Sequence, residues 1–138
     1  VNADQIDVAL DIDHVSASGG RLACGTIMVY SDKNCIVDVL RNDLDFFREE
    51  SCGQCTPCRE GTYELYRLVT KISEGKGSVA DLNTIHELCE VMKNTALCGL
   101  GVSATVPTTT CISNFREAFL AHIDGDHCSV CNLNGGDN

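Results

Sequence analysis

From residue 34 onward, apolar residues recur at intervals of three and four positions, which predicts amphipathic helices. Four such segments are separated by short stretches rich in glycine, cysteine or polar residues. Four helices joined by short connections predict a small antiparallel bundle. The residues expected to face inward are, in chain order, Ile36, Leu40, Leu44 and Phe47; Leu65, Leu68, Val69 and Ile72; Leu82, Ile85, Leu88, Cys89 and Met92; and Cys111, Ile112, Phe115 and Phe119.

Local signals give the ends of these helices. The second helix is predicted over 57–73 and ends at the Gly-Lys-Gly run that follows it. The third helix begins at Ser78, where Asp81 completes a capping box in its aspartate form. Pro107 is expected to open the fourth helix, which leaves 96–106 as a loop.

The first 33 residues have a different pattern. Apolar residues alternate over 6–10 and 11–15, and a short apolar run rich in β-forming residues covers 26–30. These patterns predict short strands, and two or three short strands do not form a stable unit alone. We therefore interpret 1–33 as the end of a β domain whose beginning is missing. The tail, 124–138, is polar apart from two cysteines.

The predicted fold is mainly α. A four-helix bundle over 34–123 is preceded by the short β segment of 1–33 and followed by a cysteine-containing tail over 124–138. In an up-down-up-down bundle, the connections after the first and third helices lie at the same end. Both of these connections carry cysteines, so we expect those cysteines to come together.

Composition excludes several classes of function. The formal net charge is −10, and no basic patch suited to nucleic acid is present. The sequence has no apolar run long enough to span a membrane and no apolar leader segment, so we expect a cytoplasmic or organelle-matrix protein. Because the chain begins Val-Asn-Ala-Asp rather than with Met, we expect a processed product or a piece of a longer polypeptide.

Ten of the 138 residues are cysteines. In a small secreted domain this density would predict disulfides. A helical core of the predicted size needs no such cross-links, and thiols two residues apart on a loop pair only with strain. We therefore favour reduced, metal-binding cysteines.

Cys52, Cys55 and Cys58 form a C-x₂-C-x₂-C pattern in one connection, and Cys98 lies forty residues further along the chain. This spacing suits a [4Fe–4S] cluster with four thiolate ligands. A structural zinc site more often uses two C-x₂-C pairs, so zinc is the weaker alternative for these four thiols.

Neighbouring residues suit the negative charge of such a cluster. Gly53 lets the backbone pass close to the sulfurs, and Gly99 and Gly101 are expected to do the same around the fourth thiol. Pro57 favours a helix start, and the N–H groups of that start would point toward the cluster. Arg59 adds a cation beside the thiols.

Two motifs carry a family resemblance. The run E-S-C-G-Q-C-T-P-C-R-E-G at 50–61 closely resembles the cluster motif of the NADH-oxidising flavoprotein subunit of respiratory complex I and its relatives in NAD(P)-linked hydrogenases and formate dehydrogenases. L-C-G-L-G at 97–101 is similar to their downstream motif, with the fourth ligand at Cys98. The resemblance covers nearly the whole chain, and it implies that 1–33 end a β-grasp domain and that 34–123 form the cluster domain.

In that family FMN and NAD(H) bind an N-terminal domain whose Gly-rich loop holds the flavin phosphate. Nothing in this sequence resembles that loop. The resemblance therefore implies only a relay, in which one [4Fe–4S] cluster passes electrons from a flavin held elsewhere. FMN and NAD(P) are expected on missing or partner domains, and no complete active site is expected here.

A second group of residues resembles features of the hydrogenase-type and formate-dehydrogenase-type subunits. Cys35 opens the first helix at the end far from the cluster, and His122 closes the fourth helix at the same end. With Cys128 and Cys131 they would form a Cys₃His site, which zinc favours. Three alternatives stay open: His127 replaces His122, Cys35 is a small buried hydrophobe, or the tail cysteines begin a longer cysteine pattern.

The other chemistry-bearing residues are interpreted as structural. Cys24, Cys89 and Cys111 lie on strand or helix faces and are expected to be inert buried thiols. The segment 99–104 matches G-x-G-x-x-A, but it follows a helix rather than a strand, so we do not interpret it as a dinucleotide fingerprint.

The predicted function is an electron-transfer module of an NAD(P)-linked multisubunit oxidoreductase of the hydrogenase or formate dehydrogenase type. One alternative is a structural zinc module with a role in assembly and no redox role. Another is an incomplete copy of a larger subunit that folds only against its other domains. The expected partners are a flavin- and NAD-binding domain and further iron–sulfur subunits.

Overall fold

The computed structural model describes residues 3–22, 25, 27–125, 128 and 130–131. The chain divides into two compact units, residues 1–31 and residues 32–138. All of the predicted cluster and metal ligands belong to the second unit. None of the helices in the described part of the chain combines the length and apolar character needed to cross a membrane.

Helix α2 (Ile36–Glu49) opens the second unit and buries Leu40 and Leu44 as predicted, with Val37 buried in place of the partly buried Ile36. Val37, Leu40 and Leu44 are fully buried, while Phe47 packs at the edge of the core. Burying each such side chain contributes roughly 1.5–3 kcal/mol relative to leaving it in water. Burial of this apolar face is therefore what holds α2 in the bundle.

Helices α3 (Thr56–Ser73) and α4 (Val79–Thr95) pack side by side. They approach closely at Gly61, because its missing side chain leaves room for the buried Met92. A Cβ atom at Gly61 would lie 2.5 Å from the sulfur of Met92. The spacing of these two helices therefore depends on a glycine in the middle of a helix.

The turn between α3 and α4 has the predicted capping box. The N–H of Asp81 donates to Ser78 Oγ at 3.3 Å, and the N–H of Ser78 donates to Asp81 Oδ2 at 2.7 Å. Lys71 on α3 donates to the same carboxylate at 2.8 Å. Gly77 is required in the turn, because a Cβ atom there would lie 2.9 Å from the Cα atom of Ile72.

Helix α5 covers Gly99–Asn114. The predicted loop over 96–106 is therefore wrong from residue 99 onward, and the predicted helix start at Pro107 is wrong as well. The helix begins at Gly99, and Pro107 lies inside it. A proline inside a helix costs about 3 kcal/mol, because it lacks an N–H and its ring crowds the preceding turn. Packing on both sides of the proline offsets this cost, since Ala104 and Thr108 are completely buried.

The predicted fourth helix is in fact two helices. Helix α6 (Arg116–Ile123) follows α5 after a break at Phe115, whose φ and ψ angles of −128° and 34° are not helical. Phe115 was expected to face inward, but it lies at the break and is partly exposed. Phe119 is completely buried, as predicted, and brings α6 against the bundle.

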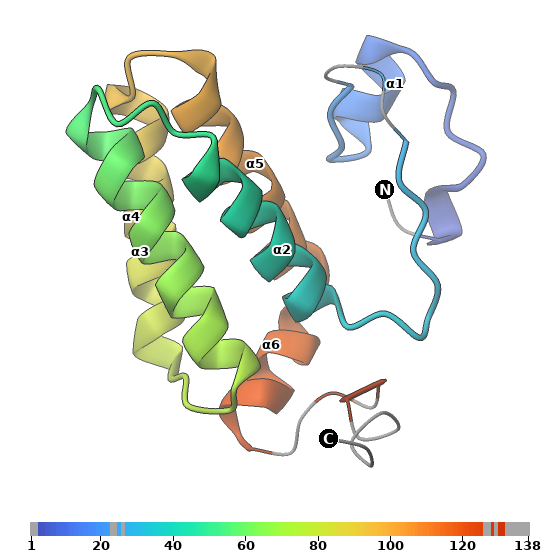
Figure 1. Cartoon of the computed structure of the whole chain (residues 1–138). Coiled ribbons are helices and arrows are strands. Elements are labelled where there is room, and N and C mark those ends of the chain that lie inside the picture. The colour runs from blue at the N-terminus through green and yellow to red at the C-terminus, as the bar shows by residue number, and fades with distance from the viewer. Residues whose placement is uncertain (1–2, 23–24, 26, 126–127, 129, 132–138) are drawn as a thin grey trace. The chain divides into compact units, whose positions relative to one another are not determined.

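Helices α2, α3, α4 and α5 form the four-helix bundle, which confirms the predicted mainly-α fold (Figure 1). The connection from α2 to α3 and the connection from α4 to α5 lie at the same end of the bundle. The α3–α4 turn, the start of α2 and helix α6 lie at the opposite end. This topology separates the two groups of cysteines along the length of the bundle.

The first unit corrects the predicted β segment. A single turn of 3₁₀ helix, η1, covers Ala3–Gln5, and helix α1 covers Ile12–Ala17. Asp11 caps α1, because its carboxylate accepts the N–H of His14 at 2.8 Å. Such local side-chain bonds favour a helix start even where apolar and polar residues alternate.

No strand occurs among the described residues of the first unit. The predicted strand at 26–30 is irregular over 27–30, and Thr26 lies outside the described residues. A strand needs a paired neighbour to be stable, and none is described here. That residues 1–33 end a β-grasp domain stays a prediction.

Close packing at Gly61 gives a test of the bundle. We expect Gly61→Ala to lower the free energy of unfolding by about 1–3 kcal/mol through overpacking, and Met92→Ala to lower it by about 2–5 kcal/mol through a cavity. The double variant should lose less stability than the two single losses added together, because Met92→Ala removes the atoms that the new methyl group at Gly61 would crowd. Chemical unfolding of the full chain measures all three, and simple additivity would contradict the packing described.

Candidate functional site

The first group of cysteines lies in the connection between α2 and α3. Gly53 has a φ of +74°, a conformation that other residues rarely adopt, and it turns the chain between Cys52 and Cys55. Arg59 Nη1 donates to the carbonyl oxygen of Gly53 at 2.6 Å. The arginine therefore fixes the turn and places a positive charge beside it.

Two of the predicted ligands are the N-cap residues of helices. Cys55 caps α3 and Cys98 caps α5, and neither side chain makes a capping hydrogen bond. The first N–H groups of a helix have no partner within the helix, and that end carries a partial positive charge. Both helices therefore present donors and positive charge at the end of the bundle where the thiols lie.

The two cysteine-bearing connections touch. The pKa of the Cys55 thiol is lowered, first by the backbone N–H of Leu97, then by that of Cys58, and also by the charge of Arg59. Leu97 immediately precedes Cys98, so the connection that carries the fourth predicted ligand lies against the connection that carries the first three.

Gly101 provides a second contact between the connections. A Cβ atom on Gly101 would lie 3.1 Å from Cys58 Cβ, 3.4 Å from Cys58 Sγ and 2.8 Å from the Cβ atom of Ala96. Any larger residue would push α5 away from α3. Cys58 is buried at this contact, whereas Cys52 and Cys98 are exposed.

The residues at this end fit an iron–sulfur cluster. Four thiols come from two connections that touch, and backbone donors and the Arg59 guanidinium supply positive charge for a negatively charged group.

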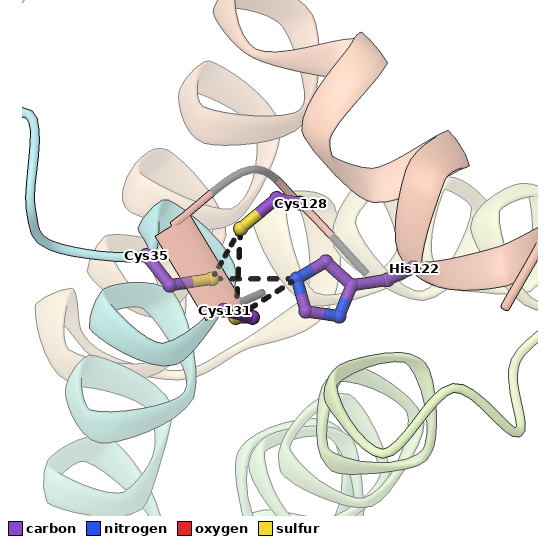
Figure 2. Close-up of side chains that lie close together, drawn as sticks. All are labelled: Cys35, His122, Cys128 and Cys131. Carbon is purple, nitrogen blue, oxygen red and sulfur yellow. Dashed lines mark hydrogen bonds between the residues drawn. The ribbon is translucent and has the colours of Figure 1, made fainter. Parts of the chain in front are cut away.

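The second group lies at the opposite end of the bundle, and the structure brings its four residues together (Figure 2). The ligand atoms of Cys35, His122, Cys128 and Cys131 all lie within 4.8 Å of one another. Cys128 Sγ is 3.5 Å from both other sulfurs, and His122 Nε2 is 3.4 Å from Cys35 Sγ and 3.7 Å from Cys131 Sγ.

These distances fit one tetrahedral ion. With Zn–S bonds of about 2.3 Å, two thiolates on one zinc are about 3.8 Å apart. The four separations given above are 3.4–3.7 Å. The arrangement is therefore close to that of a Cys₃His site, with each ligand atom directed toward a common centre.

The bundle orients the histidine. His122 is buried, and its Nδ1 atom lies 3.2 Å from the carbonyl oxygen of Ser73 at the end of α3. A carbonyl can only accept, so Nδ1 carries the hydrogen and Nε2 is left as a ligand atom. Ser73 Oγ in turn donates to Asp38 on α2 at 2.7 Å, which joins α2, α3 and α6 at this end.

Burial raises the pKa of Cys35 and that of Cys131. Burial also acts on Cys128, but hydrogen bonds from the backbone and side chain of Cys131 lower the pKa of Cys128 overall. The alternative ligand His127 lies outside the described residues.

Cys89 and Cys111 belong to neither group of predicted ligands. Burial raises the pKa of Cys89 to about 12 and that of Cys111 to about 11, so both thiols stay protonated near neutral pH. Cys24 lies outside the described residues. The G-x-G-x-x-A segment forms the start of α5 and follows a cysteine rather than a strand.

Sequence reasoning overlooked three contributors to these sites. Leu97 and Ser73 act through backbone atoms, which carry no sequence signal. Ser51 lies beside a cysteine, and its Oγ atom is 3.4 Å from Cys58 Sγ. Its place inside the motif at 50–61, directly before Cys52, was the signal that could have identified it.

Residues 38–122 match the family described as the NADH-ubiquinone oxidoreductase-F iron–sulfur binding region. The NADP-reducing hydrogenase protein HndC of Solidesulfovibrio fructosivorans is 38% identical over 123 residues, which are 89% of this chain and 25% of HndC. An NADH-quinone oxidoreductase subunit of Mycobacterium tuberculosis (strain ATCC 25618 / H37Rv) is 34% identical over 125 residues, or 91% of this chain and 28% of that protein.

A solved structure of an air-oxidised NAD⁺-reducing [NiFe]-hydrogenase is also similar. It superposes with a TM-score of 0.77 at 30% identity, over 88% of this chain and 20% of the hydrogenase chain. This chain therefore spans about a quarter of the length of the curated relatives it matches.

The thiol environments predict an order of chemical reactivity. In the metal-free chain at pH 7.5, we expect iodoacetamide to modify Cys55 well before Cys89, because only thiolates react and the two pKa values are shifted in opposite directions. Raising the pH to 9 should not make Cys89 reactive, because its pKa lies higher still. Peptide mass spectrometry over time measures both rates, and equal rates would contradict these environments.

Proposed function

The chain belongs to the family of the NADH-ubiquinone oxidoreductase-F iron–sulfur binding region, and from this premise we propose that it relays electrons through one [4Fe–4S] cluster. We assign Cys52, Cys55, Cys58 and Cys98 as the four ligands. The observation that best supports this assignment is the contact between the two connections, in which Gly101 packs against Cys58 and the backbone of Leu97 lowers the pKa of Cys55.

When bound, the cluster would accept and release single electrons. The residues of the chain would stabilise the added negative charge. The N-termini of α3 and α5 both face the thiols with unpaired N–H groups, and Arg59 is held beside them by the carbonyl oxygen of Gly53. Fixed donors of this kind favour the reduced state relative to the same cluster in water.

Electrons would cross the exposed edge of the site. Cys52 and Cys98 are exposed and Cys58 is buried, so one side of the thiol group faces outward and the other faces the core. A redox partner that docks on the outer side would come nearest to the cluster there. The formal net charge of −10 favours a partner with a basic docking face.

We place this relay in an NAD(P)-linked multisubunit oxidoreductase. The similar proteins are named as part of an NADP-reducing hydrogenase, part of an NADH-quinone oxidoreductase and an NAD⁺-reducing hydrogenase. FMN and NAD(P) would bind to other domains or subunits. The cysteine and histidine group at the second end favours the hydrogenase-type branch over complex I.

At the second end we assign Cys35, His122, Cys128 and Cys131 as ligands of one structural zinc ion. The short separations of the ligand atoms and the fixed histidine tautomer support zinc rather than a cluster. The site would tie the start of α2, the end of α6 and the tail to one another, and metal binding would add directly to folding stability.

Serine in place of the fourth thiol tests the cluster assignment. We expect Cys98→Ser, purified without air, to lose at least a quarter of its iron and to lose or change the paramagnetic signal of the reduced cluster, because the hydroxyl is a poor iron ligand. Cys89→Ala is the matched control, since Cys89 is a buried thiol on α4 outside both groups. Normal iron in Cys98→Ser, or a large loss in Cys89→Ala, would contradict the assignment.

Removal of the histidine tests the zinc site. We expect His122→Ala to lose its zinc, to keep its iron and to unfold at a lower temperature, because the metal links three segments of the chain. His86→Ala is the control, since His86 is exposed on α4. Elemental analysis and thermal unfolding measure these effects, and unchanged zinc content in His122→Ala would rule out this ligand set.

A further inference from the structure

Ser51 lies immediately before the first ligand cysteine, where the chain leaves α2. Its hydroxyl oxygen is 3.4 Å from Cys58 Sγ. The backbone N–H of Gly53 donates to the same oxygen, also at 3.4 Å. The serine is therefore held between the turn and the buried cysteine.

The direction of the Ser51 bond follows from its partners. A ligand thiolate has no hydrogen, so Cys58 can only accept once it holds a cluster. The N–H of Gly53 occupies one lone pair of the hydroxyl, which leaves the O–H hydrogen free to point at the sulfur. Hydrogen bonds to a charged acceptor are stronger than those between neutral groups.

Burial of the Cys58 sulfur strengthens the effect of this hydrogen bond. Cys58 is 5% exposed, whereas Cys52 and Cys98 are exposed. Gly101 packs against the Cys58 side chain. A donor in such a site acts with less competition from water than a donor at the exposed ligands.

We infer that Ser51 sets the reduction potential of the cluster by donating a hydrogen bond to Cys58. The inference rests on the proposed cluster ligation. Reduction adds an electron to a group that is already negative, so a donor to its sulfur stabilises the reduced state more than the oxidised state. The serine holds no iron and acts only through the cysteine.

The test is a redox titration of the full chain, purified without air and followed by the paramagnetic signal of the reduced cluster. In Ser51→Ala we expect normal iron and sulfide and a lower midpoint potential. The ratio of reduced to oxidised cluster at a fixed potential should fall about tenfold, which is about 59 mV for one electron. Ser51→Thr keeps the hydroxyl and should have the same midpoint potential as the wild type.

Thr56→Ala is the matched control, because it removes a nearby hydroxyl at the start of α3. That hydroxyl accepts from Arg59 at 3.5 Å and is not bonded to a sulfur among the described residues. It should keep the wild-type potential.

An unchanged potential in a fully loaded Ser51→Ala chain would overturn the inference, as would an equal fall in Thr56→Ala. Loss of the cluster in Ser51→Ala but not in Ser51→Thr would also overturn it, because the hydroxyl would then hold the cluster together. Absence of iron from the wild type would instead refute the proposed cluster itself.

Discussion

The contact between the α2–α3 connection and the start of α5 is the constraint on which the rest of the molecule depends. It brings two helix N-termini to one end of the bundle, each beginning directly after a cysteine. The contact needs Gly101, where a side chain would collide with Ala96 and crowd Cys58, and the backbone of Leu97 lowers the pKa of Cys55. The first N–H groups of a helix have no partner within the helix, and here those groups are available to a negatively charged ligand. The proposed electron transfer at this end and the packing of the bundle therefore depend on the same arrangement.

The bundle also separates the two proposed metal sites. Helix α3 begins at the cluster ligands and ends at Ser73, whose carbonyl oxygen fixes the histidine of the second group. The four ligand atoms of the second group are so close together that one small ion would satisfy them all. A redox centre needs ligands that tolerate a change of charge, whereas a structural ion needs a closed, fixed set. In our proposal, the two ends of the bundle meet these two requirements separately.

Much of this arrangement follows from sequence pattern. The helical period predicts the buried faces of α2, α3 and α4, and the up-down topology predicts that Cys35 and His122 share one end, where the structure brings them together with Cys128 and Cys131. The errors occurred where local signals and packing disagree. Pro107 is a strong local signal for a helix start, yet burial of Ala104 and Thr108 carries α5 through it. Apolar and polar residues alternate before residue 16, which predicts strands. The Asp11 cap and the lack of a paired strand among the described residues favour a helix there instead. The contributions of Leu97 and Ser73 come from backbone atoms, which no side-chain pattern reveals.

Elemental and spectroscopic analysis of the unaltered chain, purified without air, distinguishes an iron–sulfur cluster from a zinc ion at the ligand cysteines. Iron, acid-labile sulfide and zinc are measured per chain, and Mössbauer spectra report the type of iron centre. We expect about four iron atoms and four sulfides in one cubane cluster, together with about one zinc ion. A colourless chain that holds zinc at both ends and no iron would contradict this proposal.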